Sequence, residues 1–517
     1  MKLNRRNVLL GSTALALGSM IAPAFAQNNQ VFVLASVNDM VHFDPHIGSD
    51  IQTTFLMRNV YDALVSVESN PPVIKPRLAT EWTTSDDGLT YTFKLDASAK
   101  FHDGTPVTSA DVKYSFERLA RIGRGNSWMV AGIVGPDGID TPDDHTVVFT
   151  LMTPFAAFIQ LLPWLVVVNS ALVEANIGDD DGQTFLRAGV AGSGPFELAR
   201  FEPGSQFLFQ RVADDWHKGG GNLSAIVYKV TRESATQRLM IERGEAHFAT
   251  NLGLTDVKAI DGKPGVDLVI ERDFTTFLMR MNPKHGPLAD VNMRKALSYA
   301  LDYDAMKDVG GYHGMLSGPL PEGIFGFNPD QEVYRKDMAK AREHLAMSSN
   351  PEGGVTIVMT YTDTSELQRQ CALILADSLR ELNIELDIRP TRWADLVEMV
   401  KTPETSPDIA SINQGASYAD PDNMSYAAYH SSRNGQWQNP NYENLAVDNL
   451  IQEGRAQLDT DTRLAIYSEF QRLVVEDAPD LFGFNYSQMF AMRDNVSGYE
   501  FCPVGSASID CFPLSIN

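Results

Sequence analysis

The stretch that decides the fold is Arg77–Leu119, which reads RLATEWTTSDDGLTYTFKLDASAKFHDGTPVTSADVKYSFERL. Apolar and polar residues alternate over Leu89–Leu95, and this period of two predicts a half-buried β-strand. The Asp86–Gly88 run before it predicts a turn. Thr108, followed by Asp111 three residues later, predicts a capped helix start. The block is therefore a strand, a turn-rich connection and a helix.

The wording of this block resembles the signature of one family of bacterial proteins. Trp82, the Ser85–Gly88 turn, the Tyr91–Phe93 strand and Phe101–Thr108 are similar to the extracellular solute-binding proteins of the dipeptide, oligopeptide and nickel class, family 5. The helix Val291–Asp302 is a second match to the same family. The resemblance implies an α/β, two-lobe periplasmic-binding-protein fold of type II, cluster C, with an extra subdomain in the first lobe. It also implies the capture subunit of an ABC importer rather than an enzyme.

The chain has 517 residues, which is too long for one hydrophobic core and predicts two to four domains at about 100–200 residues each. Strand and helix patterns alternate from Val355 to Ile412, which favours a parallel sheet covered by helices on both faces. With the family resemblance, the expected division is lobe I at 27–50, 190–280 and 480–517, its extra subdomain at 51–189, and lobe II at 281–479. The chain is expected to cross between the lobes near Met281–Asn282 and near Asp480.

Residues 1–26 have the pattern of a signal peptide, with basic residues, an apolar run over Val8–Ile21 and the small-residue end Ala24–Ala26. The pair Arg5–Arg6 resembles a twin-arginine export signal, and ordinary Sec export is the alternative. We therefore expect a periplasmic protein. No other apolar run reaches the ~18–20 residues of a membrane span, so no membrane insertion is expected.

The charge balance argues against a nucleic-acid partner. The formal net charge is −24, from 66 acidic and 42 basic residues, whereas phosphate binding needs a basic face. Of the three cysteines, Cys371 is expected to be a buried thiol. Cys502 and Cys511 could form a disulfide outside the cytoplasm, or both could stay reduced.

No motif for catalysis or metal binding is found. The ten histidines do not cluster, and Asp44–Pro45 breaks the helix that His42 and His46 would need in order to share a metal. Asp179–Gly182 lacks the alternating ligands of a calcium loop. A Gly-x-Ser-x-Gly elbow and a Ser-x-x-Lys pair are both missing. We therefore expect no catalytic residue, no cofactor and no metal.

The family resemblance places one loop, within Ser411–His430, in the ligand cleft. Peptide-binding members carry an aspartate four residues before the loop proline, where it pairs with the α-ammonium of the peptide. This chain has Ser417 there, and Gln414 replaces the usual tryptophan. Asp420 could supply the missing carboxylate, or the ligand could lack a free amine. Tyr418 could line the cleft or belong to the core.

Other candidate ligand-binding residues come from strand ends and from one aromatic residue. Asn38 follows the first strand, and Asn485 and Tyr486 end the last one. Trp393 opens a helix of lobe II and could stack on a ligand or belong to the core. The expected ligand is a peptide, with an opine, a sugar or a metal chelate as alternatives, and the expected partners are inner-membrane permease subunits of an otherwise monomeric protein. A secreted hydrolase and a binding-only sensor are the remaining hypotheses.

Overall fold

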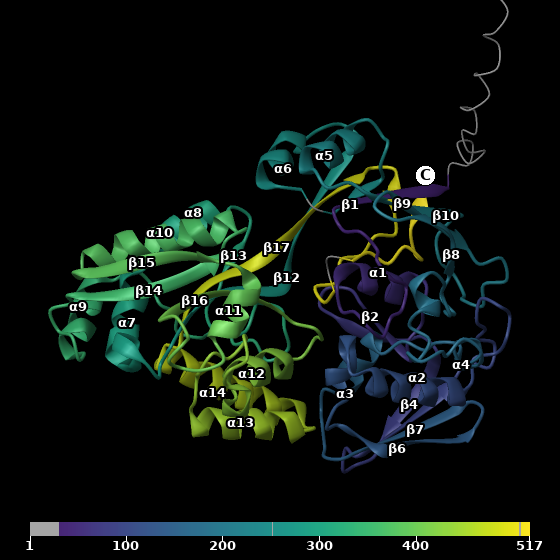
Figure 1. Ribbon diagram of the computed structural model, residues 1–517, viewed down its shortest axis with the longest axis horizontal. Coiled ribbons are helices and arrows are strands. Elements are labelled where there is room, and N and C mark those ends of the chain that lie inside the picture. The colour runs from purple at the N-terminus through teal and green to yellow at the C-terminus, as the bar shows by residue number, and fades with distance from the viewer. Residues whose placement is uncertain (1–29, 251, 506–507) are drawn as a thin grey trace, which may run out of the picture.

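A computed structural model describes residues 30–250, 252–505 and 508–517, and the expected signal peptide at 1–26 lies outside them. The described chain forms two bodies joined by a pair of long strands (Figure 1). One body contains the chain up to β12 together with the C-terminal segment after β17, and the other contains the segment from about residue 282 to 479. The two joining strands are β12 (Val266–Met281) and β17 (Asp480–Arg493).

One eleven-stranded sheet runs through both bodies in the order β15-β14-β16-β12-β17-β11-β1-β10-β9-β8, with β13 added beside β17. At one end β1 pairs in parallel with β10 and β11, and at the other β14 pairs in parallel with β15 and β16. The remaining strands of this sheet are β1 (Val31–Ser36), β8 (Phe196–Glu202), β9 (Gln206–Arg211), β10 (Ala225–Val230), β11 (Phe248–Ala249), β13 (Gly314–Met315), β14 (Val355–Thr362), β15 (Ile384–Thr391) and β16 (Ile409–Gly415).

A separate four-stranded antiparallel sheet, β4-β5-β7-β6, lies in the predicted extra subdomain. Its apolar alternation buries Tyr91 and Phe93 against the helix that the Thr108–Asp111 capping box begins, which confirms the local prediction. The elements of this region are α1 (Ile51–Asn59), β2 (Val65–Glu68), β3 (Val73–Pro76), β4 (Ala79–Thr84), β5 (Thr90–Leu95), α2 (Ser109–Ile122), β6 (Val134–Asp143), β7 (Thr146–Leu151), α3 (Phe158–Leu161) and α4 (Ser170–Glu174).

Helices cover both faces of the sheet in the second body. Leu375 of α10 shares a core cluster with Ile409 of β16, whereas Leu396 of α11 packs with Ile412 from the opposite face of that strand. The remaining helices of the chain, of which the first two belong to the first body, are α5 (Ser234–Glu242), α6 (Leu254–Ile260), α7 (Val291–Ala300), α8 (Tyr303–Gly310), α9 (Met338–Met347), α10 (Glu366–Arg380), α11 (Trp393–Met399), α12 (Pro421–Tyr429), α13 (Leu445–Ala456) and α14 (Thr460–Asp477). No described helix is long and apolar enough to cross a membrane.

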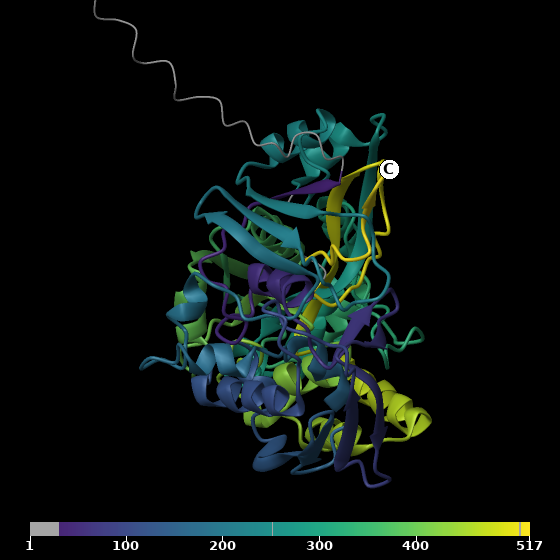
Figure 2. The ribbon, with the colours of Figure 1, turned by 90° about the vertical axis from the view of Figure 1, so that its right-hand side faces the viewer.

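The two strands that join the bodies are irregular in their middle part. β12 and β17 pair antiparallel along their length, and Figure 2 shows them running beside each other through the molecule. The pairing slips between Arg272 and Thr276, and the following residues of β12 pair with β16 of the second body. The expected crossings at Met281–Asn282 and Asp480 lie where β12 ends and β17 begins. The register shifts lie farther along the strand pair, between Arg272 and Leu278.

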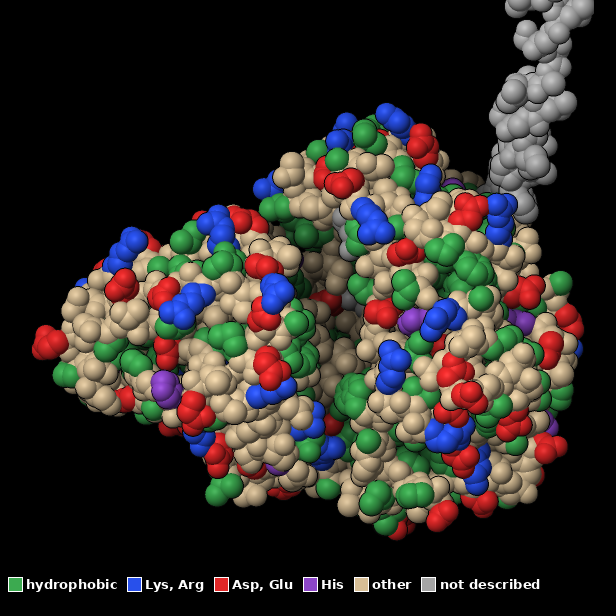
Figure 3. Space-filling view, viewed as in Figure 1, with side chains coloured by type: hydrophobic (Ala, Val, Ile, Leu, Met, Phe, Trp, Pro, Cys, Tyr) green, Lys and Arg blue, Asp and Glu red, His purple; other side chains and the backbone are tan. Residues whose placement is uncertain are grey.

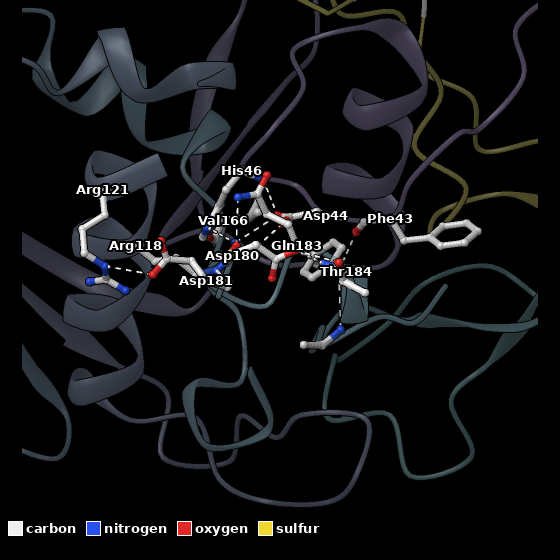
Figure 4. A network of polar contacts seen from close by, with 12 residues as sticks. Phe43, Asp44, His46, Arg118, Arg121, Val166, Asp180, Asp181, Gln183 and Thr184 are labelled. Carbon is white, nitrogen blue, oxygen red and sulfur yellow. Dashed lines mark hydrogen bonds and ion pairs between the residues drawn. The ribbon is translucent and has the colours of Figure 1, made fainter. Parts of the chain in front are cut away.

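A buried ion pair ties the loop after β1 to the extra subdomain (Figure 4). Both carboxylate oxygens of Asp44 accept hydrogen bonds from Arg118 of α2, at 2.9 and 2.6 Å, and both side chains are fully buried. Burial lowers the pKa of His46 beside them to about 4, since it outweighs the attraction of the Asp44 carboxylate, and Arg118 lowers it further. The histidine expected to be unable to bind a metal is thus a neutral part of this network.

The two bodies also touch on the side remote from the strand pair. The backbone N–H of Ala156 donates to the carbonyl of Arg455 at 2.8 Å, and the Arg455 guanidinium lies 5.1 Å from the centre of the Phe155 ring. Nearby, Gly88 in the β4–β5 turn approaches Leu458 so closely that a Cβ on the glycine would lie 2.8 Å from a leucine methyl carbon. The structure is therefore an arrangement in which the bodies meet at both edges of the space between them.

The three cysteines are buried free thiols. Cys502 and Cys511, which could have formed a disulfide, belong to two different hydrophobic clusters, and no bond joins them in the structure. Burial raises the pKa of the Cys511 thiol, which keeps it protonated and unreactive.

Replacing Asp44 by asparagine should strongly destabilise the fold. The change leaves the Arg118 charge buried without a counter-charge, which costs about 3–5 kcal/mol. The matched control is Asp377→Asn, because Asp377 pairs with Arg380 on the surface with its side chain 81% exposed, and we expect a loss below about 1 kcal/mol there. Chemical denaturation of both variants checks this, and equal losses would contradict the assigned role of the buried pair.

A charge at Leu458 should change the strength of the contact between the two bodies on this side. Leu458 is 41% exposed and lies beside Gly88, which follows Asp86 and Asp87. Leu458→Glu therefore places like charges together and should increase the radius of gyration in solution scattering, whereas Leu458→Lys should not. The difference should fade at high salt. Identical scattering from both variants at low salt would show that this contact has no part in holding the two bodies together.

Candidate functional site

Two adjoining cavities lie between the bodies, in the hollow visible down the middle of Figure 3. The first, of about 400 Å³, is lined by residues of the extra subdomain, by the crossing strands and by the loop after β16. The second, of about 450 Å³, is lined mainly by the second body. Trp128, Gly415 and Ser417 line both cavities, so the two form one cleft. Its combined size is that of a small-molecule site.

The crossing strands build one wall of the first cavity. Asp273 of β12 accepts hydrogen bonds from the backbone N–H of Thr275 at 2.8 Å and from the Gln488 amide of β17 at 2.7 Å. The Asn485 amide donates to the Asp273 carbonyl at 2.6 Å. Asp273 is the charged residue among the described residues that line this cavity. The irregular part of the strand pair thus presents the Asp273 carboxyl group and the Gln488 amide to the cleft, whereas the predicted Asn485 is buried and is not among the described lining residues of either cavity.

The loop after β16 builds the boundary between the cavities. Ser417 is exposed to the cleft, and its backbone N–H donates to the Asn423 side chain at 2.8 Å, which anchors the loop to α12. Tyr418 is buried behind it, where its hydroxyl donates to Asp422 at 2.6 Å and its ring lies 6.3 Å from that of Trp128. Ser417 therefore faces the cleft, and the Tyr418 ring lies near that of Trp128.

Asp420 does not supply the missing carboxylate. Its two oxygens accept hydrogen bonds from Arg463 of α14 at 2.7 and 2.9 Å, and both side chains are almost completely buried. One of them also caps α12 by accepting from the backbone N–H of Asp422. The charge is neutralised inside the second body, so Asp420 stabilises the loop and does not line either cavity.

Gln414 lines the second cavity, but its buried side chain is held by a hydrogen bond from Arg280. Its side-chain oxygen accepts a hydrogen bond from Arg280 at 2.8 Å, and Arg280 lies 3.6 Å from Asp480. Burial raises the pKa of Asp480, while the Arg280 charge and the Tyr429 hydroxyl partly oppose that shift. Gln414 thus links the cleft wall to the end of β17.

The remaining predicted residues lie around the cleft rather than in it. Trp393 is 41% exposed, with its ring 5.2 Å from that of Trp437, which does line the second cavity. The Tyr486 hydroxyl donates to Asn413 at 3.3 Å. Asn38 is half-buried at the end of β1. Among the described lining residues of the two cavities, none of Asn38, Trp393 and Tyr486 is found.

Several residues that line the cavities were not predicted from the sequence. Trp128 projects from the 3₁₀ helix Gly125–Met129, and its side chain remains 47% exposed. Lys401 follows the last residue of α11 by two positions, and Arg433 is the last residue of the 3₁₀ helix Ser431–Arg433. An exposed tryptophan in the Gly-Asn-Ser-Trp loop was the available signal, while the two basic residues carry no local pattern.

Comparison with known proteins agrees with this geometry. Residues 73–436 match the family model described as bacterial extracellular solute-binding proteins, family 5 Middle. The Escherichia coli (strain K12) protein named "Probable D,D-dipeptide-binding periplasmic protein DdpA" is 30% identical over 516 residues, covering 97% of this chain and 98% of its own.

Solved structures show the same fold. HbpA2 from Haemophilus parasuis has a TM-score of 0.85 at 20% identity, covering 94% of this chain and 100% of its own. The periplasmic binding protein DppA from Helicobacter pylori, in complex with the peptide STSA, has a TM-score of 0.78 at 23% identity, covering 94% and 98%. The expected two-lobe periplasmic-binding-protein fold is thereby confirmed. With a cleft between two α/β lobes and a match over most of its length, this chain belongs to the bacterial extracellular solute-binding proteins of family 5.

Proposed function

We propose that this protein captures a short peptide between its lobes in the periplasm and delivers it, as a monomer, to the inner-membrane permease of an ABC importer. The observation that carries the proposal is the cleft itself, because residues of both lobes and of the crossing strands line one continuous space. The names of the relatives support a peptide as ligand, since one is named a probable D,D-dipeptide-binding periplasmic protein and a structural neighbour is described in complex with the peptide STSA.

Closure supplies the mechanism. A ligand that touches both lobes binds the shut arrangement more tightly than the open one, and only that difference can move the equilibrium. Here Trp128 of the subdomain and Ser417 of lobe II line the same space, so a ligand between them joins the two bodies. The contacts of Ala156 with Arg455 and of Gly88 with Leu458 then form as the bodies meet.

The cleft walls favour binding over chemistry. The carboxyl groups of the loop after β16 are neutralised, Asp420 by Arg463 and Asp422 by Arg455 with the Tyr418 hydroxyl. Asp273 is held by donors from Thr275 and Gln488. Fixed, hydrogen-bonded side chains of this kind hold a polar ligand in place without moving a proton.

Isothermal titration with short free-amine peptides should show binding, and the bound peptide should be recovered unchanged by mass spectrometry. A micromolar affinity corresponds to about −8 kcal/mol, which is enough to drive closure. Recovery of hydrolysed peptide would contradict the proposal in favour of a secreted hydrolase. Binding of an opine, a sugar or a metal chelate with no peptide bound would replace the ligand class while keeping the transport role.

Ser417→Asp should raise the affinity for free-amine dipeptides. The substitution places a carboxylate on the exposed cleft wall, where a charge-assisted hydrogen bond to the α-ammonium is worth about 1.5–3 kcal/mol. N-acetylated dipeptides carry no ammonium and serve as the matched control, for which no gain is expected. An equal change for both kinds of dipeptide would show that Ser417 does not face the ligand's amino end.

A further inference from the structure

A further cavity lies in the second body, separate from the cleft. It has a volume of about 350 Å³, and none of its described lining residues lines either of the two cleft cavities. Its walls come from α7, α9, α14 and the loop between β13 and α9, which all belong to the second body. A volume in the range of small-molecule sites, enclosed by one body alone, makes this cavity a candidate for a ligand other than the one in the cleft.

The Gln331 side chain brings an unpaired hydrogen-bond acceptor to this cavity. Gln331 lines the cavity and is only 9% exposed. Its amide nitrogen donates to the backbone carbonyl of Glu332 at 3.1 Å, whereas its amide oxygen is buried and no described residue donates to it. Buried polar atoms are normally paired, and an unpaired one costs free energy. A ligand that donates a hydrogen bond to this oxygen would remove that cost.

Two lining side chains of opposite charge also lack a partner. Lys295 of α7 is half-buried and Glu332 is exposed, and within the described part of the chain neither side chain forms an ion pair or a hydrogen bond. Lys295 acts on His344 of α9, because burial lowers the pKa of that imidazole and the Lys295 charge lowers it further. Glu332 acts on Tyr334, since burial raises the pKa of that hydroxyl and nearby negative charge, including that of Glu332, raises it further. The cavity thus has a free cation near α9 and a free carboxylate near the loop before it.

The other charged lining groups are already satisfied. The Arg472 guanidinium donates to Glu476 and to both carboxylate oxygens of Glu469, each at 2.8 Å. His344, kept neutral by its lowered pKa, donates through Nδ1 to the Asn292 side-chain oxygen at 3.1 Å. Lys295 and Glu332 are therefore the charges that remain for a ligand.

Aromatic rings form the apolar part of the cavity wall. Tyr299 and Tyr334 meet edge to face with their ring centres 4.9 Å apart. The Tyr334 hydroxyl donates to the Val475 carbonyl at 3.0 Å, and the Tyr299 ring stacks on His344 at 5.6 Å. These contacts fix both rings, and fixed rings of this kind pack well against an apolar or aromatic side chain.

We propose that this cavity is a second binding site, which takes a small zwitterion of the amino-acid class. The ammonium group of such a ligand donates to the Gln331 oxygen beside the Glu332 carboxylate, and its carboxylate pairs with Lys295. Its side chain packs against Tyr299 and Tyr334. Because one body supplies every described wall, the site can fill without the two bodies meeting, and it does not depend on the peptide proposed for the cleft.

Calorimetry with phenylalanine and two capped forms of it tests the site. The wild-type protein should bind phenylalanine about tenfold or more tightly than phenylalaninamide, which lacks the carboxylate, and than N-acetylphenylalanine, which lacks the ammonium. Lys295→Gln should remove the preference over the amide, and Glu332→Gln should reduce the preference over the acetylated form. Gln331→Met should weaken binding of the two forms that carry an ammonium.

Arg342→Gln is the matched control for these variants. Arg342 is an exposed cation of α9 that pairs with Glu381 and does not line the cavity, so its loss should leave the affinity for phenylalanine unchanged. Trp128→Ala changes the cleft instead. Phenylalanine binding that persists in Trp128→Ala but weakens in Lys295→Gln would support the site.

Three results would overturn the site. They are no binding of phenylalanine to the wild-type protein, equal binding of its three forms, and binding that is lost in Trp128→Ala but kept in Lys295→Gln, which would place the amino acid in the cleft. Peptide capture is judged separately, since a peptide in the cleft should bind Lys295→Gln as tightly as the wild-type protein. Failure of either proposal therefore leaves the other standing.

Discussion

The antiparallel pairing of β12 with β17 is the constraint on which the rest of the structure depends. These two strands carry one sheet through both lobes, and their register slips between Arg272 and Thr276. A slip of this kind bends and twists a strand pair locally. Asp273, Thr275 and Gln488 come from this same place and line the cleft. The irregular part of the sheet is therefore also a part that lines the cleft.

The local elements around the signature block could be read from the sequence, because each has a short-range cause. The strand at Thr90–Leu95 follows from strict alternation, and the helix from Ser109 follows from a capping box that the structure confirms. The full length of the crossing strands could not be read in this way. Glu271, Arg272 and Asp273 interrupt the apolar pattern of β12, and Ser487 and Gln488 do the same in β17. These polar residues are tolerated inside strands because the sheet leaves the cores of the lobes there.

The residues of the candidate site also fall into two groups, those that local sequence could predict and those that depend on long-range contacts. The sequence could place Ser417 and Gln414 at the cleft because one loop follows one strand and resembles a known loop. It could not show that Arg463, more than forty residues away, takes the charge of Asp420. Trp128 and Arg433 meet in one space only after both lobes have folded, so no spacing in the chain records their proximity.

Charged side chains are distributed unevenly along the cleft. Asp420, in the loop after β16, is paired with Arg463 within the second body, whereas the cations Lys401 and Arg433 line the second cavity. The charged lining residues of the cleft are therefore one carboxylate at the crossing strands and two cations on the second body.

The most direct test of the central claim is a spin-label distance between the lobes, measured with Glu81→Cys and Asp461→Cys. Both positions are exposed, and the native thiols are buried, so only the introduced cysteines should react. The account predicts a broad or longer distance distribution without ligand that becomes short and narrow with a bound peptide. Distributions that are the same with and without a peptide shown to bind would contradict closure about the β12–β17 pair.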